Sequence, residues 1–339
     1  VASKPRCPYS QHCGVVLRRL LRLGHCHIKN LSMLKLPEYR HGKEVVLSAS
    51  EFSVTYRAIR LKDLADVAVK VTDIVKLAES GRSDYRHESR VLQNAVHPHI
   101  LRAVYGYYDE ETKKFLLETE YCRGGSLWGL MAWMRKSDMR FSEQEVWELF
   151  AQLVSALHYL HKTNEHIGIT AHLNLRPDNV LLTQDGILKL CGFGYSATRE
   201  PNKLFTLRNP GTAYHAPEIV AFTNSQGSNE GYTEAADIWS LGCMIYELCT
   251  FKRIENEPVS SFNPLPENLE TPGYADDLLI LIKACLAPNP RERITAELLM
   301  ASPPIQAAYA RINDILKAGR KWSGLIIEMQ RELRQSTQS

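Results

Sequence analysis

The sequence lacks the features that mark several classes of protein. Its most apolar helical stretch, 238–250, is interrupted by Glu247 and falls short of the roughly 20 residues that a membrane-spanning helix needs. The spacing of its eight cysteines suggests no disulfide framework, which favours a reducing, cytoplasmic compartment. With a net charge of +3 on 339 residues, the chain offers no basic stripe that would bind a nucleic acid.

Acidic residues are missing from the first 32 positions, which carry six lysines and arginines, so the remainder of the chain is mildly acidic. Cysteines and histidines also gather here, but without a Cys-x-x-Cys pair they give little support for a zinc site. The basic apolar run 14–23 faintly resembles a transit peptide. The preferred interpretation is that residues 1–37 form a basic, disordered extension.

Short alternating strands give way to helices along the rest of the chain. Strands are expected at 45–47, 53–60, 65–73, 101–107, 114–119 and 187–190. Helices are expected at 83–96, 141–161, 234–250, 275–287, 295–300 and 304–334. Ser142 and Glu145 are spaced as a capping box at the start of the second helix. Strands followed by helices predict an α+β chain with two lobes.

Several short motifs follow one another in an order that points to one family. They are Val67-Ala68-Val69-Lys70, Glu88, the segment from Thr119 to Cys122, Ala216-Pro217-Glu218, Asp237-Ile238-Trp239-Ser240-Leu241-Gly242 and Arg293. In this order they resemble a eukaryotic protein kinase domain. The run 237–249 is most similar to the NIMA-related (never-in-mitosis-A-related) kinases. The resemblance implies a small β-rich N-lobe at 38–119, a larger helical C-lobe at 120–302 and a helical tail at 303–339.

The resemblance also implies roles for individual residues. Lys70 and Glu88 correspond to the pair that positions the ATP phosphates, although a purely structural ion pair is the alternative. The other residues expected at the nucleotide are Thr119, Glu120, Cys122 and Asn179. Asn179 corresponds to a metal ligand, but a loop-stabilising hydrogen bonder is the preferred interpretation. The residues expected to hold the frame are the stack His172, Phe193 and Leu92, the buried pair Glu218 and Arg293, and Asp237 beneath the catalytic loop.

Two acidic residues on which kinase chemistry depends are absent. The catalytic loop of a kinase begins His-Arg-Asp, whereas residues 172–174 read His-Leu-Asn. The metal-binding turn of a kinase reads Asp-Phe-Gly, whereas residues 192–194 read Gly-Phe-Gly. Asn174 cannot accept a proton near neutral pH, and Gly192 has no side chain with which to ligate a metal.

The groups that would surround the phosphates also depart from the kinase pattern. Serines stand at all three glycine positions of the phosphate loop, Ser48, Ser50 and Ser53, which restricts the close approach of the backbone. Leu173 replaces the arginine that would bind a phosphorylated activation segment. Arg176 replaces a lysine and keeps the charge with a different geometry. A tight turn between the strands is still expected at the serines.

These departures predict a protein that is not an enzyme, namely a pseudokinase with no metal site that binds ATP weakly or without metal. Its predicted work is to bind protein partners as a scaffold or regulator, for example of an active kinase or a cytoskeletal complex, in the cytoplasm. One alternative is a weakly active serine/threonine kinase with unconventional metal ligation. The other is a non-catalytic nucleotide-binding module.

Overall fold

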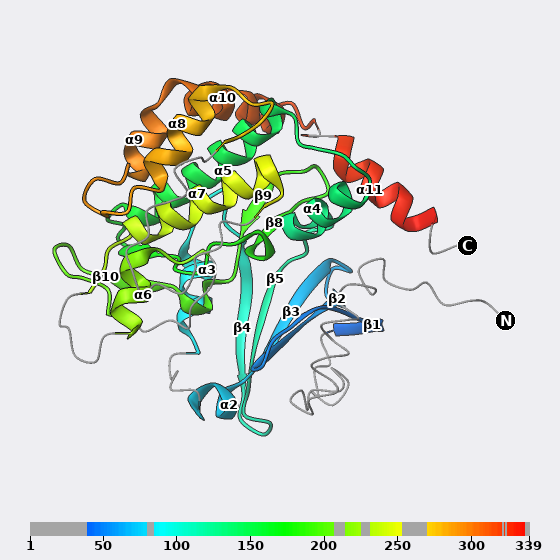
Figure 1. Cartoon of the computed structure of the whole chain (residues 1–339). Coiled ribbons are helices and arrows are strands. Elements are labelled where there is room, and N and C mark those ends of the chain that lie inside the picture. Colours follow the sequence, from blue (N-terminus) through cyan, green and yellow to red (C-terminus); the bar gives the residue numbers. More distant parts are fainter. Residues whose placement is uncertain are drawn as a thin grey trace. The chain divides into compact units, whose positions relative to one another are not determined.

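The computed structural model describes residues 39–79, 85–206, 214–224, 231–252, 270–320, 322 and 324–335 (Figure 1). The chain divides into two compact units. The N-terminal unit holds the described residues up to Gln93 together with 101–123 and the end of the chain from 327. The C-terminal unit holds 94–100 and 124–326. The predicted extension 1–37 lies outside the described residues.

The N-terminal unit is built on a five-stranded antiparallel sheet of order β1-β2-β3-β5-β4. Its strands are β1 (Tyr39–Ala49), β2 (Ser53–Arg60), β3 (Asp66–Asp73), β4 (Ala103–Asp109) and β5 (Lys114–Glu120). Its helices are α2 (Ile74–Glu79) and α3 (His87–Asn94). Alternate residues of β2, namely Val54, Tyr56 and Ala58, are buried in one cluster with residues of β3, as the period of a strand requires.

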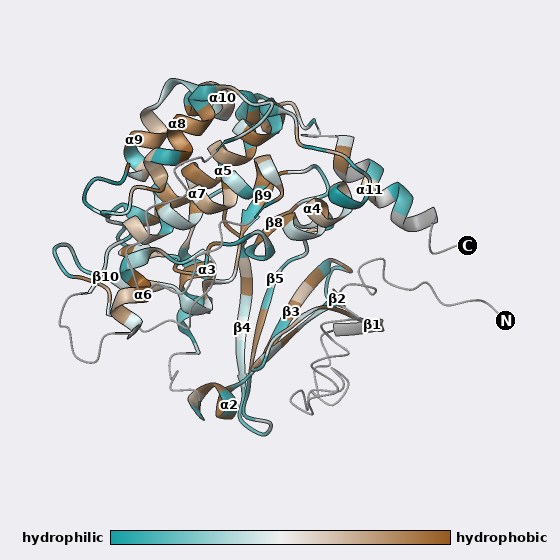
Figure 2. Ribbon diagram, viewed as in Figure 1, coloured by the Kyte–Doolittle hydropathy of each residue, from teal (hydrophilic) through white to brown (hydrophobic). Residues whose placement is uncertain are grey.

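The described part of the C-terminal unit is mostly helical. Its helices are α4 (Leu127–Lys136), α5 (Glu143–His161), α6 (Pro217–Asn224), α7 (Ala235–Thr250), α8 (Asp276–Cys285), α9 (Ala296–Ala301) and α10 (Pro303–Lys317). Its short strands are β6 (Gly125–Ser126), β7 (Ile169–Ala171), β8 (Val180–Leu182), β9 (Leu188–Leu190) and β10 (Ala197–Arg199). Helix α7 is apolar through most of its length (Figure 2) and contributes to the core.

The predicted α+β class, with a β-rich region followed by a helical region, is confirmed. The capping box is also confirmed, because Ser142 Oγ accepts from the Glu145 N–H at 3.3 Å and Glu145 Oε2 accepts from the Ser142 N–H at 2.9 Å. Along the described chain, we find no helix with the length and apolarity to cross a membrane. The domain boundaries at 119/120 and 302/303 stay predictions.

The predicted helix 304–334 is wrong as a single element. It is two helices, α10 and α11 (Gly324–Gln335), because the chain leaves the helical path at Gly319, where φ is +58°. The predicted helix 83–96 is shorter than expected and spans His87–Asn94, while Ser83 lies outside the described residues. Helix α2 was not expected, since a stretch of six residues is too short to show a helical period.

Candidate functional site

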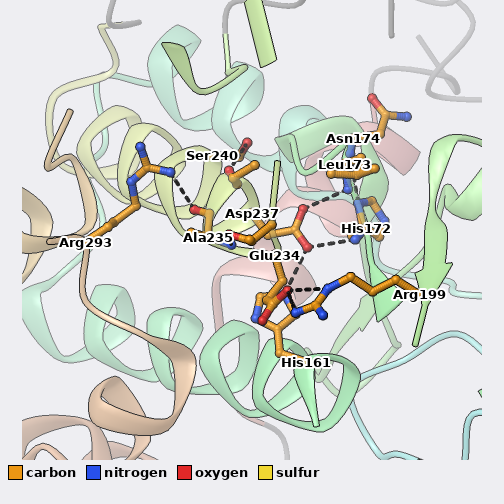
Figure 3. A network of polar contacts seen from close by, with 12 residues as sticks. His161, His172, Leu173, Asn174, Arg199, Glu234, Ala235, Asp237, Ser240 and Arg293 are labelled. Carbon is orange, nitrogen blue, oxygen red and sulfur yellow. Dashed lines mark hydrogen bonds and ion pairs between the residues drawn. The ribbon is translucent and has the colours of Figure 1, made fainter. Parts of the chain in front are cut away.

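A buried carboxylate on α7 fixes the backbone of the loop that follows β7 (Figure 3). Asp237 Oδ2 accepts the N–H of His172 at 2.7 Å, and Oδ1 accepts the N–H of Leu173 at 2.7 Å. The Nε2 atom of His161, on α5, lies 3.0 Å from Asp237 Oδ2. The end of α5 and the loop after β7 therefore meet at one side chain of α7, which lies 65 residues beyond His172.

The environment of Asp237 favours its charged form. Burial by itself raises the pKa of this carboxyl, but the hydrogen bond and charge of His161 and the hydrogen bond from the His172 backbone lower it by more, so its pKa lies below the ordinary value. The carboxylate in turn holds Leu173 at a φ of +58°, which bulky residues with a β-carbon rarely adopt. The loop conformation thus depends on a charged acceptor inside the core.

The His172 side chain joins this loop to the turn after β9. Its Nε2 lies 2.8 Å from the carbonyl oxygen of Cys191, and its ring meets the Phe193 ring edge-on with centroids 4.7 Å apart. Both rings are fully buried. The expected stack of His172 and Phe193 is present within the C-terminal unit. Leu92 is buried in the N-terminal unit, and its membership of the stack stays a prediction.

Asn179 and Gly192 lie against each other in the part of the loop where a kinase holds its metal. The Nδ2 atom of Asn179 donates to the carbonyl oxygen of Asn174 at 2.7 Å, and the Asn179 carbonyl accepts the Cys191 N–H at 2.9 Å. Gly192 has a φ of +84°, and a β-carbon there would lie 2.5 Å from Cγ and Oδ1 of Asn179. This turn is therefore packed too closely to accept any side chain at position 192 without movement.

Arg176, which stands at the lysine position of the catalytic loop, is bound within its own loop. Its Nε and Nη2 donate to Asp178 Oδ2 at 2.9 and 2.8 Å. Both side chains are about one-third exposed. Asp178 therefore partly neutralises the charge of Arg176.

Lys70 and Glu88 form the expected ion pair within the N-terminal unit. Lys70 Nζ on β3 lies 2.6 Å from Glu88 Oε2 on α3, and the pair is largely shielded from water. Thr119 is buried and its hydroxyl donates to the Glu120 carbonyl at 3.3 Å, while the Glu120 carboxylate accepts the Arg102 N–H at 2.9 Å. Cys122 is also buried. Lys70 is therefore paired with Glu88 as expected, and a role for these residues at a nucleotide stays a prediction.

Ser50 and Ser53 close the hairpin between β1 and β2 through side-chain hydrogen bonds. Ser50 and Ser53 hydroxyls lie 2.9 Å apart, and Ser50 Oγ accepts the Ser53 N–H at 3.1 Å. Ser48 is paired in the ladder opposite Thr55. The expected tight turn forms, and hydroxyl contacts stabilise it where a kinase uses glycine.

Glu218 and Arg293 form the expected pair between α6 and the segment before α9. Arg293 Nη1 and Nη2 donate to the two Glu218 oxygens at 2.6 and 3.0 Å, and Nη1 also donates to the Ala235 carbonyl at 2.7 Å (Figure 3). The Arg293 side chain is fully buried. Such a forked pair fixes the two segments on α7.

The residues around Gly192 do not match the metal site of a kinase. Within the described chain, no three His, Cys, Asp or Glu side chains gather so as to hold a metal ion. Asn179 offers one neutral oxygen, and its nitrogen is engaged with Asn174. A divalent cation at this place would lack the carboxylate that neutralises its charge.

Sequence reasoning missed His161 and His215, which both act on the catalytic loop. His161 contacts Asp237, and the His215 ring forms a hydrogen bond with the Leu173 backbone. Burial lowers the pKa of His215 below its ordinary value. Neither residue belongs to a motif with a local spacing, so only its position in the fold reveals it.

Comparison with known proteins gives the family. The family model described as the protein kinase domain matches residues 44–305. The chain belongs to the protein kinase family. It is similar to the G2-specific protein kinase nim-1 of Neurospora crassa, with 29% identity over 75% of this chain and 32% of that protein.

Two further relatives support a link to the NIMA and Nek kinases. The G2-specific protein kinase fin1 of Schizosaccharomyces pombe is 28% identical over 74% of this chain and 37% of that protein. The serine/threonine-protein kinase Nek9 of Mus musculus is 31% identical over 76% of this chain and 25% of that protein. The chain spans well under half the length of these relatives.

The prediction that the chain is not an enzyme is corrected by these relatives, which are named as protein kinases and, for Nek9, as a serine/threonine-protein kinase. That prediction rested on Asn174 and Gly192, together with the altered phosphate loop and the changes at Leu173 and Arg176. The absence of two carboxylates lowers the expected rate, but it does not by itself establish that no phosphate is transferred.

Proposed function

We propose that the chain is a slow serine/threonine protein kinase. The observation that carries the proposal is the closed Lys70–Glu88 ion pair, at 2.6 Å, in a chain whose kinase-domain match covers both units. In protein kinases this pair must be in place for the lysine to position the ATP phosphates. The buried support of the catalytic loop by Asp237 is a second element of the same machinery.

The expected rate follows from the residues that differ. Protein kinases commonly turn over at about 1–100 s⁻¹. A positioned general base contributes about 10²–10⁴-fold, and Asn174 can orient a hydroxyl but cannot take its proton. The attacking hydroxyl would therefore lose its proton to solvent. A rate at least about 10²-fold below the usual range is expected.

Charge balance on the phosphates would depend on cationic side chains of this chain. Lys70 is a point charge with three donors, and Arg176 presents a planar fork that Asp178 already holds. Since the turn at Gly192 supplies no carboxylate, phosphate transfer would not depend on a metal held at that residue. Changing the divalent cation should therefore alter the rate less than in kinases that keep the carboxylate.

The test is transfer of labelled phosphate from ATP to a serine- and threonine-containing protein substrate by the purified chain. Label is expected on serine or threonine, and Lys70→Met should abolish it. Lys62→Met, which removes an exposed lysine in the loop before β3, is the matched control and should leave the rate unchanged. Label that is equal in the Lys70→Met variant and the parent protein would reject the proposal.

A nucleotide-binding module without turnover is the second candidate, and the side-chain-free turn at Gly192 is the observation that favours it. A bound nucleotide raises stability by RT ln(1 + [L]/Kd), which is about 2.7 kcal/mol at one hundred times Kd. Under this candidate, millimolar ATP raises the melting temperature of the parent but not of Lys70→Met, and no label is transferred. A melting temperature that ATP leaves unchanged would exclude it.

A scaffold or regulatory role with a protein partner remains a proposal that is compatible with slow catalysis. The chain spans 20% to 45% of the length of the nim-1, fin1, Nek9, Nek1 and nimA kinases, so their partners are not assigned to it from this match. Co-purification of the intact chain with an active kinase would support the role, and loss of that association in a surface variant would locate the contact.

A further inference from the structure

The activation segment, here residues 193–206, is held in place although the usual phosphate receptor is absent. A kinase orders this segment by pairing a phosphorylated residue with the arginine of the catalytic loop. Leu173 occupies that arginine position and is 1% exposed. An apolar side chain inside the core cannot bind a phosphate.

Two hydroxyl groups of the segment, those of Ser196 and Thr206, are poorly placed for phosphorylation to order it. Ser196 is 5% exposed and its Oγ donates to the Phe193 carbonyl at 2.8 Å. Thr206 is exposed, but the position that would receive its phosphate is Leu173. Other contacts hold the segment in its described conformation.

A short antiparallel ladder provides the first of these contacts. Strand β10 pairs with β7, with Ala197 opposite Ala171 and Arg199 opposite Ile169. The hydroxyls of Thr170 and Thr198 lie 3.1 Å apart across the ladder. Three residue pairs alone are a marginal unit, because an isolated two-stranded ribbon is barely stable in water.

An ion pair beside the ladder provides the second contact. Arg199 Nε and Nη2 donate to Glu234 Oε2, at the start of α7, at 3.1 and 2.6 Å (Figure 3). The Arg199 side chain is 11% exposed and that of Glu234 26% exposed, so water screens the pair only in part. The guanidinium also lies 5.5 Å from the centroid of the Phe205 ring.

Phe205 carries the attachment further along the segment. It forms an isolated antiparallel bridge with Tyr232, whose N–H and carbonyl bond the Phe205 backbone at 3.0 and 2.8 Å. Phe205 is 3% exposed. The arginine thus lies between two attachment points, one at β10 and one at Phe205, and links both to α7.

We propose that Arg199 and Glu234 are positioning residues that hold the activation segment in its ordered form without phosphorylation. The proposal deepens the function proposed above, since an ordered segment is what a protein substrate of a kinase would meet. In this arrangement a carboxylate fixed on α7 takes the place of a phosphate on the segment, and an arginine on the segment takes the place of the catalytic-loop arginine.

The first test measures order directly, by hydrogen exchange of peptides that cover residues 196–206 in the phosphatase-treated chain. Arg199→Ala and Glu234→Ala should each raise the hydrogen-exchange rate of the β10 amides about tenfold. This size is expected because a half-buried ion pair stabilises more than an exposed pair and less than a fully buried one. Lys203→Ala breaks an exposed pair in the same segment and is the matched control, with exchange expected to stay unchanged. Exchange unaffected by either alanine variant overturns the proposal.

A charge exchange separates the ion pair from the fold of α7. Each single charge reversal, Arg199→Glu or Glu234→Arg, should speed hydrogen exchange in β10. The double variant should restore slow hydrogen exchange, because it again places opposite charges at the two positions. If the double variant exchanges as fast as the singles, the pair is not the cause of order. Kinase treatment of the parent chain, followed by the same measurement, should leave β10 exchange unchanged.

Activity gives a separate readout. Where labelled phosphate transfer is measured, Arg199→Ala should raise KM for the protein substrate while KM for ATP stays unchanged. Absence of any transfer in the parent chain would remove the proposed function, while the exchange data would still decide the role of Arg199 and Glu234.

Discussion

Gly192→Ala provides the sharpest test of the site geometry. A β-carbon at this position would lie 2.5 Å from Asn179 Cγ and Oδ1 and 2.9 Å from Nδ2. Overfilling a well-packed site costs about 1–3 kcal/mol. The φ of +84° adds about 1–2 kcal/mol for a residue with a β-carbon. The variant should therefore lose about 2–5 kcal/mol of unfolding free energy.

A matched control separates the two contributions. Gly273 has a φ of +86°, and a β-carbon there would meet nothing within 4 Å. Gly273→Ala should therefore show only the backbone cost, about 1–2 kcal/mol. The excess loss in Gly192→Ala over Gly273→Ala measures the contact with Asn179.

A double-mutant cycle then assigns the contact. Asn179→Ala removes the obstructing amide together with its 2.7 Å hydrogen bond to Asn174, which alone costs about 1 kcal/mol. In the double variant Gly192→Ala should cost about 1–3 kcal/mol less than it does alone. Urea denaturation followed by circular dichroism is the assay. Additive losses, or equal losses at Gly192 and Gly273, would refute the reasoning.

Three further predictions concern stability and rate. Burial lowers the pKa of His97 to about 4 and of His99 to about 3, so both side chains stay neutral in the folded protein. The free energy of unfolding should therefore fall progressively as the pH drops below about 6.5 towards those values. Urea denaturation at about pH 7.5 and about pH 5 checks this, and equal stability at the two pH values contradicts it. Trp322→Phe removes the 2.6 Å hydrogen bond from Nε1 to the buried Glu148 and should lower the free energy of unfolding by about 1–3 kcal/mol. Thermal denaturation measures this loss, and an unchanged melting temperature would show that the indole donor is dispensable. Asn174→Asp restores a proton acceptor and should raise the rate of phosphate transfer about 10²–10⁴-fold. The same change in a Lys70→Met background is the control. A rate that does not rise would exclude position 174 as the limiting group.

The motifs were readable from the sequence because each is local. Lys70 lies within the strand expected at 65–73, and Ser142 and Glu145 stand three residues apart, so strand period and capping chemistry place them without tertiary information. The prediction of one helix at 304–334 was wrong, because the pattern of apolar residues continues past Gly319 whereas the helical backbone does not. Local period predicts elements better than it predicts their ends.

The sequence by itself determined the order of strands and helices, the family resemblance and the two positions where carboxylates are missing. Only the tertiary structure decided that Asn179 fills the space at Gly192 and that Arg199 reaches Glu234. The physical reason is separation along the chain. Periodicity and capping act over a few residues, whereas these contacts join residues 13 to 35 positions apart, and their geometry depends on how the intervening chain packs.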